Sequence, residues 1–383
     1  MIFIAGISIA LFISALLLVK KDKSKSDVFL FLWMILNATH LTFFYLLYST
    51  VIYDYPILLG LQFPLPLLHG VLLYYYVSSS TNQFPKNKFT VFLHLIPTII
   101  VLLYIIPFVT LPPDQKIEVF KSKGKGYEIF QNILLFSVFF SGIFYVIWSN
   151  FLLRNHKKRI RSQFSNIEEI SLKWLQFLTY GLGIIWSLAI LSQNNILIST
   201  GVSVFVILIG FFGIQQKNIF SSQEKASSII PSINSNDEVE QTKIRNLEDN
   251  QTYQNESEKY KSSGLSDEKA LKYYEKLILA MKQEKVFTNP ELSLSDLASK
   301  LDIHPNYLSQ IINEKENKTF YDFINEYRIE EFKRLILLPE NEQFTLMSIA
   351  FDCGFNSKSS FNRYFKKITE KTPSQYVKEI KSN

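Results

Sequence analysis

Two short segments near the C-terminus carry polar side chains at helical spacing. Amide, hydroxyl and imidazole groups can hydrogen-bond base edges in a major groove, and Lys and Arg can bind phosphates. The first segment is polar but almost uncharged, whereas the second is basic. The side chains that we expect to face DNA are His304, Asn306, Ser309, Gln310 and Asn313 in the first segment, and Ser357, Lys358, Ser359, Asn362, Arg363, Lys366 and Lys367 in the second.

A helix-turn-helix pattern places the first segment. The apolar residues Leu294, Leu297 and Leu301 recur at helical spacing, and small Ala298 among them lets a second helix approach closely. Pro305 fits the first turn of that second helix, which the pattern predicts from about residue 304 to 315. The first segment therefore lies on the outer face of a recognition helix.

The second segment follows the same logic. Ile349 and Ala350 face inward, and Gly354 stands where the chain must turn with positive φ. A second recognition helix is predicted at about 357–368, and a long helix at about 320–337 joins the two units. Residues 358–371 are strongly basic while 266–383 as a whole is balanced in charge, so the second unit should contribute more phosphate contacts.

With these residues in view, 268–383 resembles the DNA-binding domain of the AraC/XylS family of transcription regulators. The resemblance is sharpest in Ile349-Ala350, Gly354-Phe355, Phe361-Asn362-Arg363, Phe365-Lys366-Lys367, Thr372-Pro373-Ser374 and Tyr376. It implies seven helices, two helix-turn-helix units on one long helix, and 304–313 and 357–367 as the segments that read successive major grooves. The sequence departs from the family pattern at Asn317 and Glu370, where Gly is frequent, and at Val377, where a basic residue is frequent.

The first 215 residues are of another kind, with long apolar runs and few charges. A helix needs about 20 mostly apolar residues to cross a bilayer. Lys20 and Lys21 follow the first run and no basic residue precedes it, which favours a retained span over a cleaved signal peptide. Basic loop residues favour an N-terminus outside and a C-terminus in the cytoplasm. The seven predicted transmembrane spans are 2–19, 28–50, 56–79, 89–111, 129–153, 174–192 and 196–215.

Histidines are the main ionisable groups inside these spans. His40 and His69 lie near the middle of the second and third spans, and an ionisable residue at that depth usually faces the bundle interior. One interpretation is an intramembrane ligand site at His40 and His69. The other is that neutral imidazoles hydrogen-bond neighbouring helices. Pro97 and Pro107 are expected to kink the fourth span.

The remaining segments set the domain organisation. Residues 216–267 are rich in Ser, Asn, Gln, Glu and Lys, which predicts a flexible linker between a transmembrane domain, 1–215, and a DNA-binding domain, 268–383. The single cysteine, Cys353, falls inside a helix pattern and is expected to be a buried core thiol. We find no Walker loop, dinucleotide fingerprint, HExxH or nucleophile motif, so no enzyme, cofactor or metal is predicted.

Together the sequence predicts an all-α, multi-pass protein of the inner (cytoplasmic) membrane that binds promoter or operator DNA as a sequence-specific transcription regulator. The transmembrane bundle would act as a sensor or tether for a signal that the sequence does not identify. Double-stranded DNA and the lipid bilayer are the expected partners, and RNA polymerase and a second copy of the chain are further candidates. The alternative is a membrane receptor or transporter whose helical tail binds a protein.

Overall fold

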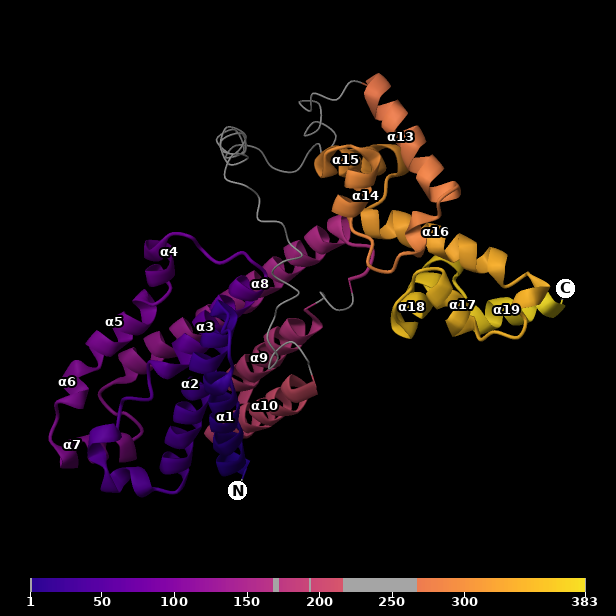
Figure 1. Cartoon of the computed structure of the whole chain (residues 1–383). Coiled ribbons are helices and arrows are strands. Elements are labelled where there is room, and N and C mark those ends of the chain that lie inside the picture. The colour runs from indigo at the N-terminus through magenta and orange to yellow at the C-terminus, as the bar shows by residue number, and fades with distance from the viewer. Residues whose placement is uncertain (1, 168–171, 193, 216–266, 383) are drawn as a thin grey trace. The chain divides into compact units, whose positions relative to one another are not determined.

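The computed structural model describes residues 2–167, 172–192, 194–215 and 267–382 (Figure 1). Throughout these residues the secondary structure is helical and no strand is present, which confirms the all-α class. One isolated antiparallel bridge pairs Phe164 with Ser293. The predicted linker lies outside the described residues, apart from Asp267.

Contacts divide the chain into two compact units. The first comprises Met1–His156 and Leu172–Ile229, and the second comprises Lys157–Ser171 and Ile230–Asn383. The second unit therefore includes a short segment, residues 157–171, that the sequence analysis assigned to the membrane half. Each unit is described below by itself.

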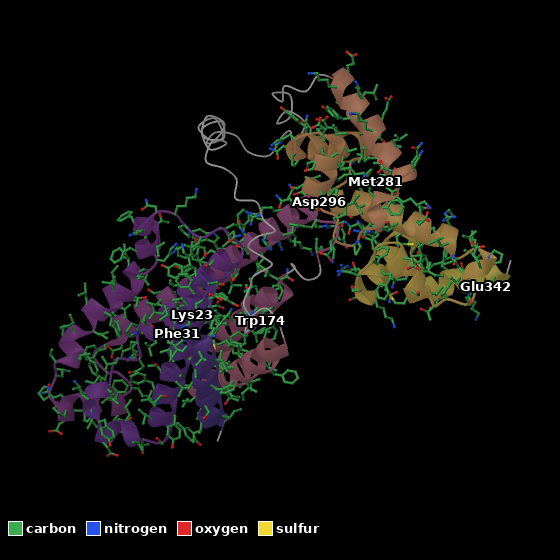
Figure 2. All side chains as sticks on the ribbon, viewed as in Figure 1. Lys23, Phe31, Trp174, Met281, Asp296 and Glu342 are labelled. Carbon is green, nitrogen blue, oxygen red and sulfur yellow. The ribbon has the colours of Figure 1, made fainter. Side chains whose placement is uncertain are left out.

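The first unit packs around long apolar helices. Helix α1 contacts α2 and α10, α2 also contacts α3, and α9 contacts α10. Trp174 belongs to its largest buried cluster, and the half-buried Phe31 packs against that cluster (Figure 2). The helices are α1 (Ile2–Val19), α2 (Lys25–Tyr48), α3 (Leu65–Ser80), α4 (Lys88–Leu93), α5 (Ile96–Tyr104), α6 (Ile106–Val109), α7 (Pro113–Lys121), α8 (Glu128–Gln163), α9 (Lys173–Ser192) and α10 (Asn195–Gln215), with 3-10 helices η1 (Val51–Asp54) and η2 (Pro56–Leu58) after α2.

Two expected spans differ from the observed helices. The span predicted at 56–79 begins as the 3-10 turn η2, and its α-helix starts only at Leu65. The span predicted at 89–111 is divided into α4, α5 and α6, and Pro97 and Pro107 each stand in the first turn of a new helix. Proline lacks the N–H that would continue the preceding hydrogen bonds, so these residues restart the helix rather than only bending it.

Among the described residues, three helices are long and apolar enough to cross a membrane: α1, α2 and α8. Two further apolar stretches, Trp174–Ala189 and Ile196–Phe211, are shorter. Large apolar side chains are exposed on the long helices, as Phe140 (63%) and Ile147 (64%) on α8 illustrate. Bilayer-facing helices expose such side chains, whereas helices of a soluble bundle bury them.

The second unit contains seven α-helices among its described residues from 267 to 382. Its first buried cluster includes Met281 of α13 (Figure 2), and its second includes Phe332 of α16. Helix α16 contributes to both clusters and contacts α15, α17 and α18 (Figure 1). The helices are α13 (Asp267–Lys282), α14 (Leu294–Leu301), α15 (Pro305–Glu316), α16 (Phe320–Leu335), α17 (Leu346–Asp352), α18 (Lys358–Thr369) and α19 (Pro373–Ser382), with 3-10 turns η3 (Val286–Thr288) and η4 (Pro339–Asn341).

Candidate DNA interface

The first helix-turn-helix is built by α14 and α15. Ser293 caps α14 in a capping box: its Oγ accepts from the backbone N–H of Asp296 at 3.1 Å, and its own N–H donates to the Asp296 carboxylate at 3.1 Å. Ala298 is fully buried where the second helix approaches. Asp302 then takes a left-handed conformation with φ of 53°, which ends α14 and turns the chain into α15.

The outer side of α15 carries most of the predicted base-reading groups. His304, Asn306 and Asn313 are exposed and Ser309 is half-buried. His304 also caps the helix, because its Nδ1 accepts from the Asn306 N–H at 3.3 Å. Gln310 is 9% exposed and its amide donates to Glu314 at 2.9 Å, so the expectation that it faces outward is wrong. One turn earlier, Asn306 remains in reach of solvent.

The second helix-turn-helix depends on one glycine. Gly354 has φ of 95°, and a Cβ atom there would lie 2.5 Å from the carbonyl oxygen of Phe287. Only glycine fits both the backbone angle and this close approach. Ser357 then caps α18 by accepting from the Ser360 N–H at 3.1 Å.

Helix α18 presents the basic set. Its buried face includes Phe361, Tyr364 and Phe365, which pack in one cluster with Phe332 of α16. The predicted contacts on its other face are exposed, except for the half-buried cap Ser357; the exposed ones are Lys358, Ser359, Asn362, Arg363, Lys366 and Lys367. Side chains of this type and spacing can bind phosphates and base edges together.

Asp322 at the start of α16 orients part of α18. Its carboxylate accepts from Lys367 Nζ at 2.8 Å and from Arg161 Nη2 at 3.0 Å, and its backbone carbonyl accepts from the Tyr364 hydroxyl at 2.8 Å. Burial alone raises the pKa of Asp322, but hydrogen bonds from Lys367 and Thr319 and the charge of Arg161 outweigh it and hold the pKa below its ordinary value. Asp322 is therefore ionised and holds Lys367 close to the domain.

Two functional side chains were missed by the sequence analysis. Asp322 and Arg328 were both assigned to a long connecting helix without a role. Arg328 is 1% exposed and donates to the carbonyls of Phe287 at 2.7 Å and Asn289 at 2.8 Å. It therefore connects α16 to the segment that precedes the first helix-turn-helix. The available signal was position: Arg328 lies four residues from Ile324 and Phe332, on the apolar stripe of its helix.

Cys353 packs as a core thiol. It is fully buried in the same cluster as Phe361, and burial raises the pKa of its thiol to about 12. The thiol is therefore protonated and unreactive at neutral pH.

Two of the histidines in the first unit, His40 and His69, contact each other. The indole N–H of Trp33 donates to His69 Nδ1 at 3.2 Å, and His69 Nε2 lies 3.0 Å from His40 Nδ1. Because indole only donates, His69 must carry its proton on Nε2 and donate it to His40. These hydrogen bonds match the interpretation that neutral imidazoles join neighbouring helices. The intramembrane ligand site at His40 and His69 stays a prediction. In the described residues no group of three or more His, Cys, Asp or Glu could hold a metal.

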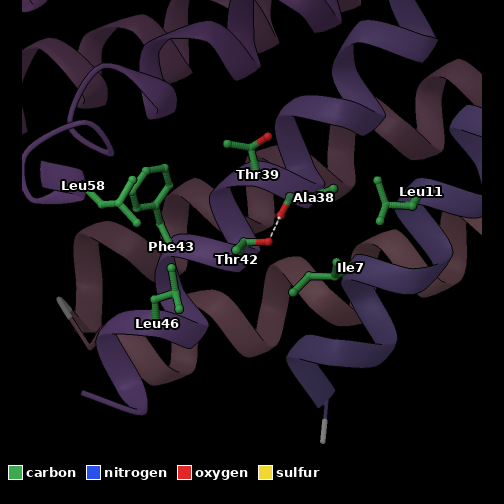
Figure 3. Close-up of a pocket in the computed structure, with 8 residues that line it drawn as sticks. All are labelled: Ile7, Leu11, Ala38, Thr39, Thr42, Phe43, Leu46 and Leu58. Carbon is green, nitrogen blue, oxygen red and sulfur yellow. Dashed lines mark hydrogen bonds between the residues drawn. The ribbon is translucent and has the colours of Figure 1, made fainter. Parts of the chain in front are cut away.

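A separate cavity of about 320 Å³ lies in the first unit (Figure 3). The hydroxyls of Thr39 and Thr42 both donate to carbonyls of their own helix, Ile35 at 3.0 Å and Ala38 at 2.8 Å. Few polar groups are left for a ligand, and an apolar chain would fit best. The lining residues are Ile7, Leu11, Ala38, Thr39, Thr42, Phe43, Leu46 and Leu58.

Comparison with known proteins identifies the C-terminal region. Residues 297–379 match the family described as a helix-turn-helix domain. The region is 32% identical over 92 residues to the Msm operon regulatory protein of Streptococcus mutans, covering 24% of this chain and 32% of that protein. It is 35% identical over 92 residues to the uncharacterised helix-turn-helix-type transcriptional regulator YobQ of Bacillus subtilis, covering 24% and 37%.

The chain thus spans about a third of the length of these relatives. A solved structure of a protein of unknown function from Listeria innocua is 28% identical and covers 27% of this chain and 94% of that one, with a TM-score of 0.25. From the family match and these relatives, residues 297–379 are similar to the helix-turn-helix domains of transcriptional regulators. This confirms the resemblance inferred from the sequence.

Proposed function

We propose that the protein is a membrane-bound, sequence-specific DNA-binding transcription regulator. The observation that carries the proposal is the exposed polar and basic face of α18, with Asn362, Arg363 and Lys366, on a domain similar to transcriptional regulators. Together with the exposed side chains of α15, it provides two recognition helices on one scaffold. Bases would be read by the amides and Arg363, and phosphates bound by the lysines.

The membrane part of the proposal rests on the first unit. Exposed apolar side chains on α1, α2 and α8 suit a lipid environment, and the four further apolar stretches of sequence would bring the crossings to seven or fewer, depending on how α3 to α6 insert. Basic residues beside these helices favour an N-terminus outside and the DNA-binding domain in the cytoplasm. The protein would then act at the inner membrane, with the bundle as sensor or tether.

Other partners follow from the same reading. A regulator of this kind would contact lipid through the first unit and operator DNA through the second, and it would affect RNA polymerase at the promoter. A dimer could form through the bundle, although each chain already carries two recognition helices.

Genome-wide DNA occupancy of the full-length chain in its host cells tests the proposal. We expect a limited set of sites that disappear in the double variant Arg363→Ala, Lys366→Ala, with unchanged protein abundance in the membrane fraction. The matched control is Lys378→Ala on α19, which removes an exposed cation outside the recognition helices and should keep the sites. Occupancy absent in every growth condition would favour a receptor or transporter whose tail binds a protein.

A further inference from the structure

The segment 157–167 is built into the second unit. It comprises the last turns of α8 and the residues that follow, and it pairs with the first helix-turn-helix through the bridge between Phe164 and Ser293. Ile160, Phe164 and Ile167 are between 2% and 8% exposed and share the buried cluster that contains Phe332 and Phe361. Burying aliphatic and aromatic side chains is favourable, so these three side chains hold the segment in the cluster that α16 helps to form.

Ser165 supplies the polar part of the docking. Its hydroxyl donates to the Leu292 carbonyl at 2.6 Å and accepts from Arg328 Nη2 at 3.1 Å, and its carbonyl accepts from Asn325 at 3.0 Å. Arg328 is the same side chain that binds Phe287 and Asn289. A single buried guanidinium therefore joins α16, the start of the first helix-turn-helix, and the end of the α8 segment.

Arg161 joins the segment to the second recognition helix. It donates to the Asp322 carboxylate at 3.0 and 3.2 Å, and the same carboxylate holds Lys367. Without Arg161, the carboxylate would keep more negative charge beside α18 and would draw Lys367 away from a phosphate. Docking thus favours the approach of an anion to this helix.

The charge of the segment also favours stronger DNA binding in the docked state. Acidic and basic residues balance in 266–383, whereas 157–167 contains Lys157, Lys158, Arg159 and Arg161 and no acidic residue. The segment turns a neutral domain into a basic one, which raises its affinity for DNA.

The chain connects this segment directly to the first unit. Helix α8 is continuous from Glu128 to Gln163, so its earlier turns belong to the first unit and its last turns to the second. A shift or rotation of α8 would act on Ser165 and Arg161 without passing through the long predicted linker.

We propose that residues 157–167 are the input element of the DNA-binding unit, meaning the segment through which α8 controls DNA binding. When docked against α16, the segment holds both helix-turn-helix halves in the DNA-binding arrangement. When α8 displaces the segment, the two halves leave that arrangement. This inference rests on the proposed DNA-binding function. It differs from a tether, because a tether would leave DNA affinity unchanged when the segment undocks.

The test uses the full chain in lipid nanodiscs, with two readouts for each variant: hydrogen exchange of the peptide covering 157–167, and affinity for DNA recovered from occupied genomic sites. Arg161→Glu is compared with Lys157→Glu, which changes charge equally at an exposed position with no role in docking. Ser165→Ala is compared with Ser162→Ala, which removes a hydroxyl that donates to the Arg159 carbonyl of its own helix.

We expect Arg161→Glu and Ser165→Ala to lose exchange protection in 157–167, and each to bind DNA at least about tenfold more weakly than its control, which corresponds to about 1.4 kcal/mol. Lost protection with unchanged affinity would overturn the input role. Retained protection in both variants would overturn the docking itself. If the wild-type chain binds no DNA, the proposed function and the input role both fail, while the exchange data still decide whether the segment docks.

Discussion

Gly354 is the position where one added methyl group should disturb the second helix-turn-helix most. A left-handed conformation costs a residue with a Cβ atom about 1–2 kcal/mol. The new Cβ would also lie 2.5 Å from the Phe287 carbonyl, 2.8 Å from the Thr288 carbonyl and 2.9 Å from Arg328 Nε. Overpacking of this kind adds about 1–3 kcal/mol. Gly354→Ala should therefore lower the free energy of local unfolding by about 2–5 kcal/mol, summed from these two terms.

The same methyl group would strain the hydrogen bond between Arg328 and Phe287, so the loss should extend to both halves of the domain. Native-state hydrogen exchange of the full chain measures this, using peptides from α14 and α17. The matched control is Asn317→Ala, because Asn317 is exposed and also left-handed, with φ of 53°. That change should cost at most about 1–2 kcal/mol, the conformational term alone. An equal loss in the two variants would refute the argument from close approach.

Three further predictions concern separate side chains. Arg363→Ala with Lys366→Ala should lower DNA affinity and reduce the slope of log affinity against log salt by about 0.9 for each phosphate contact removed, measured by fluorescence anisotropy. The pKa of Asp322 is depressed in the folded chain, so the carboxylate should stabilise the fold above pH 3.8, its ordinary pKa, and this stabilisation should be lost as pH falls through the lower folded pKa. Acid denaturation of the wild type and of Asp322→Asn tests this, and an identical pH dependence of the two would contradict it. Cys353 should resist maleimide at pH 8 in the folded chain and react on denaturation, followed by intact mass, because burial raises its pKa to about 12; rapid labelling of native protein would refute this.

Much of the second unit could be predicted from sequence because its signals are local. Cap residues and apolar spacing define each helix, and α14 occupies the residues from Leu294 to Leu301 that the pattern indicated. Glu370, which stands where the family pattern often has glycine, takes a left-handed conformation with φ of 59°. Gln310 was misplaced because one helical face was assumed to be wholly solvated, whereas its amide folds back to Glu314.

The contacts that could not be predicted are those between residues far apart in the chain. Ser165 and Arg328 are linked through buried hydrogen bonds, yet neither has a local pattern that names its partner. Likewise, Pro97 and Pro107 indicated bends, but whether each bends or restarts a helix depends on the packing around it.

In the proposed function, the second unit reads DNA while it is attached to a membrane-spanning first unit. The most direct test is binding of the purified full-length chain, in lipid nanodiscs, to a pool of genomic DNA fragments at several salt concentrations. We expect enrichment of particular fragments, affinity that falls steeply with salt, and loss of both in the Arg363→Ala, Lys366→Ala variant. Equal recovery of all fragments by the wild type and the variant, or no recovery by either, would contradict it.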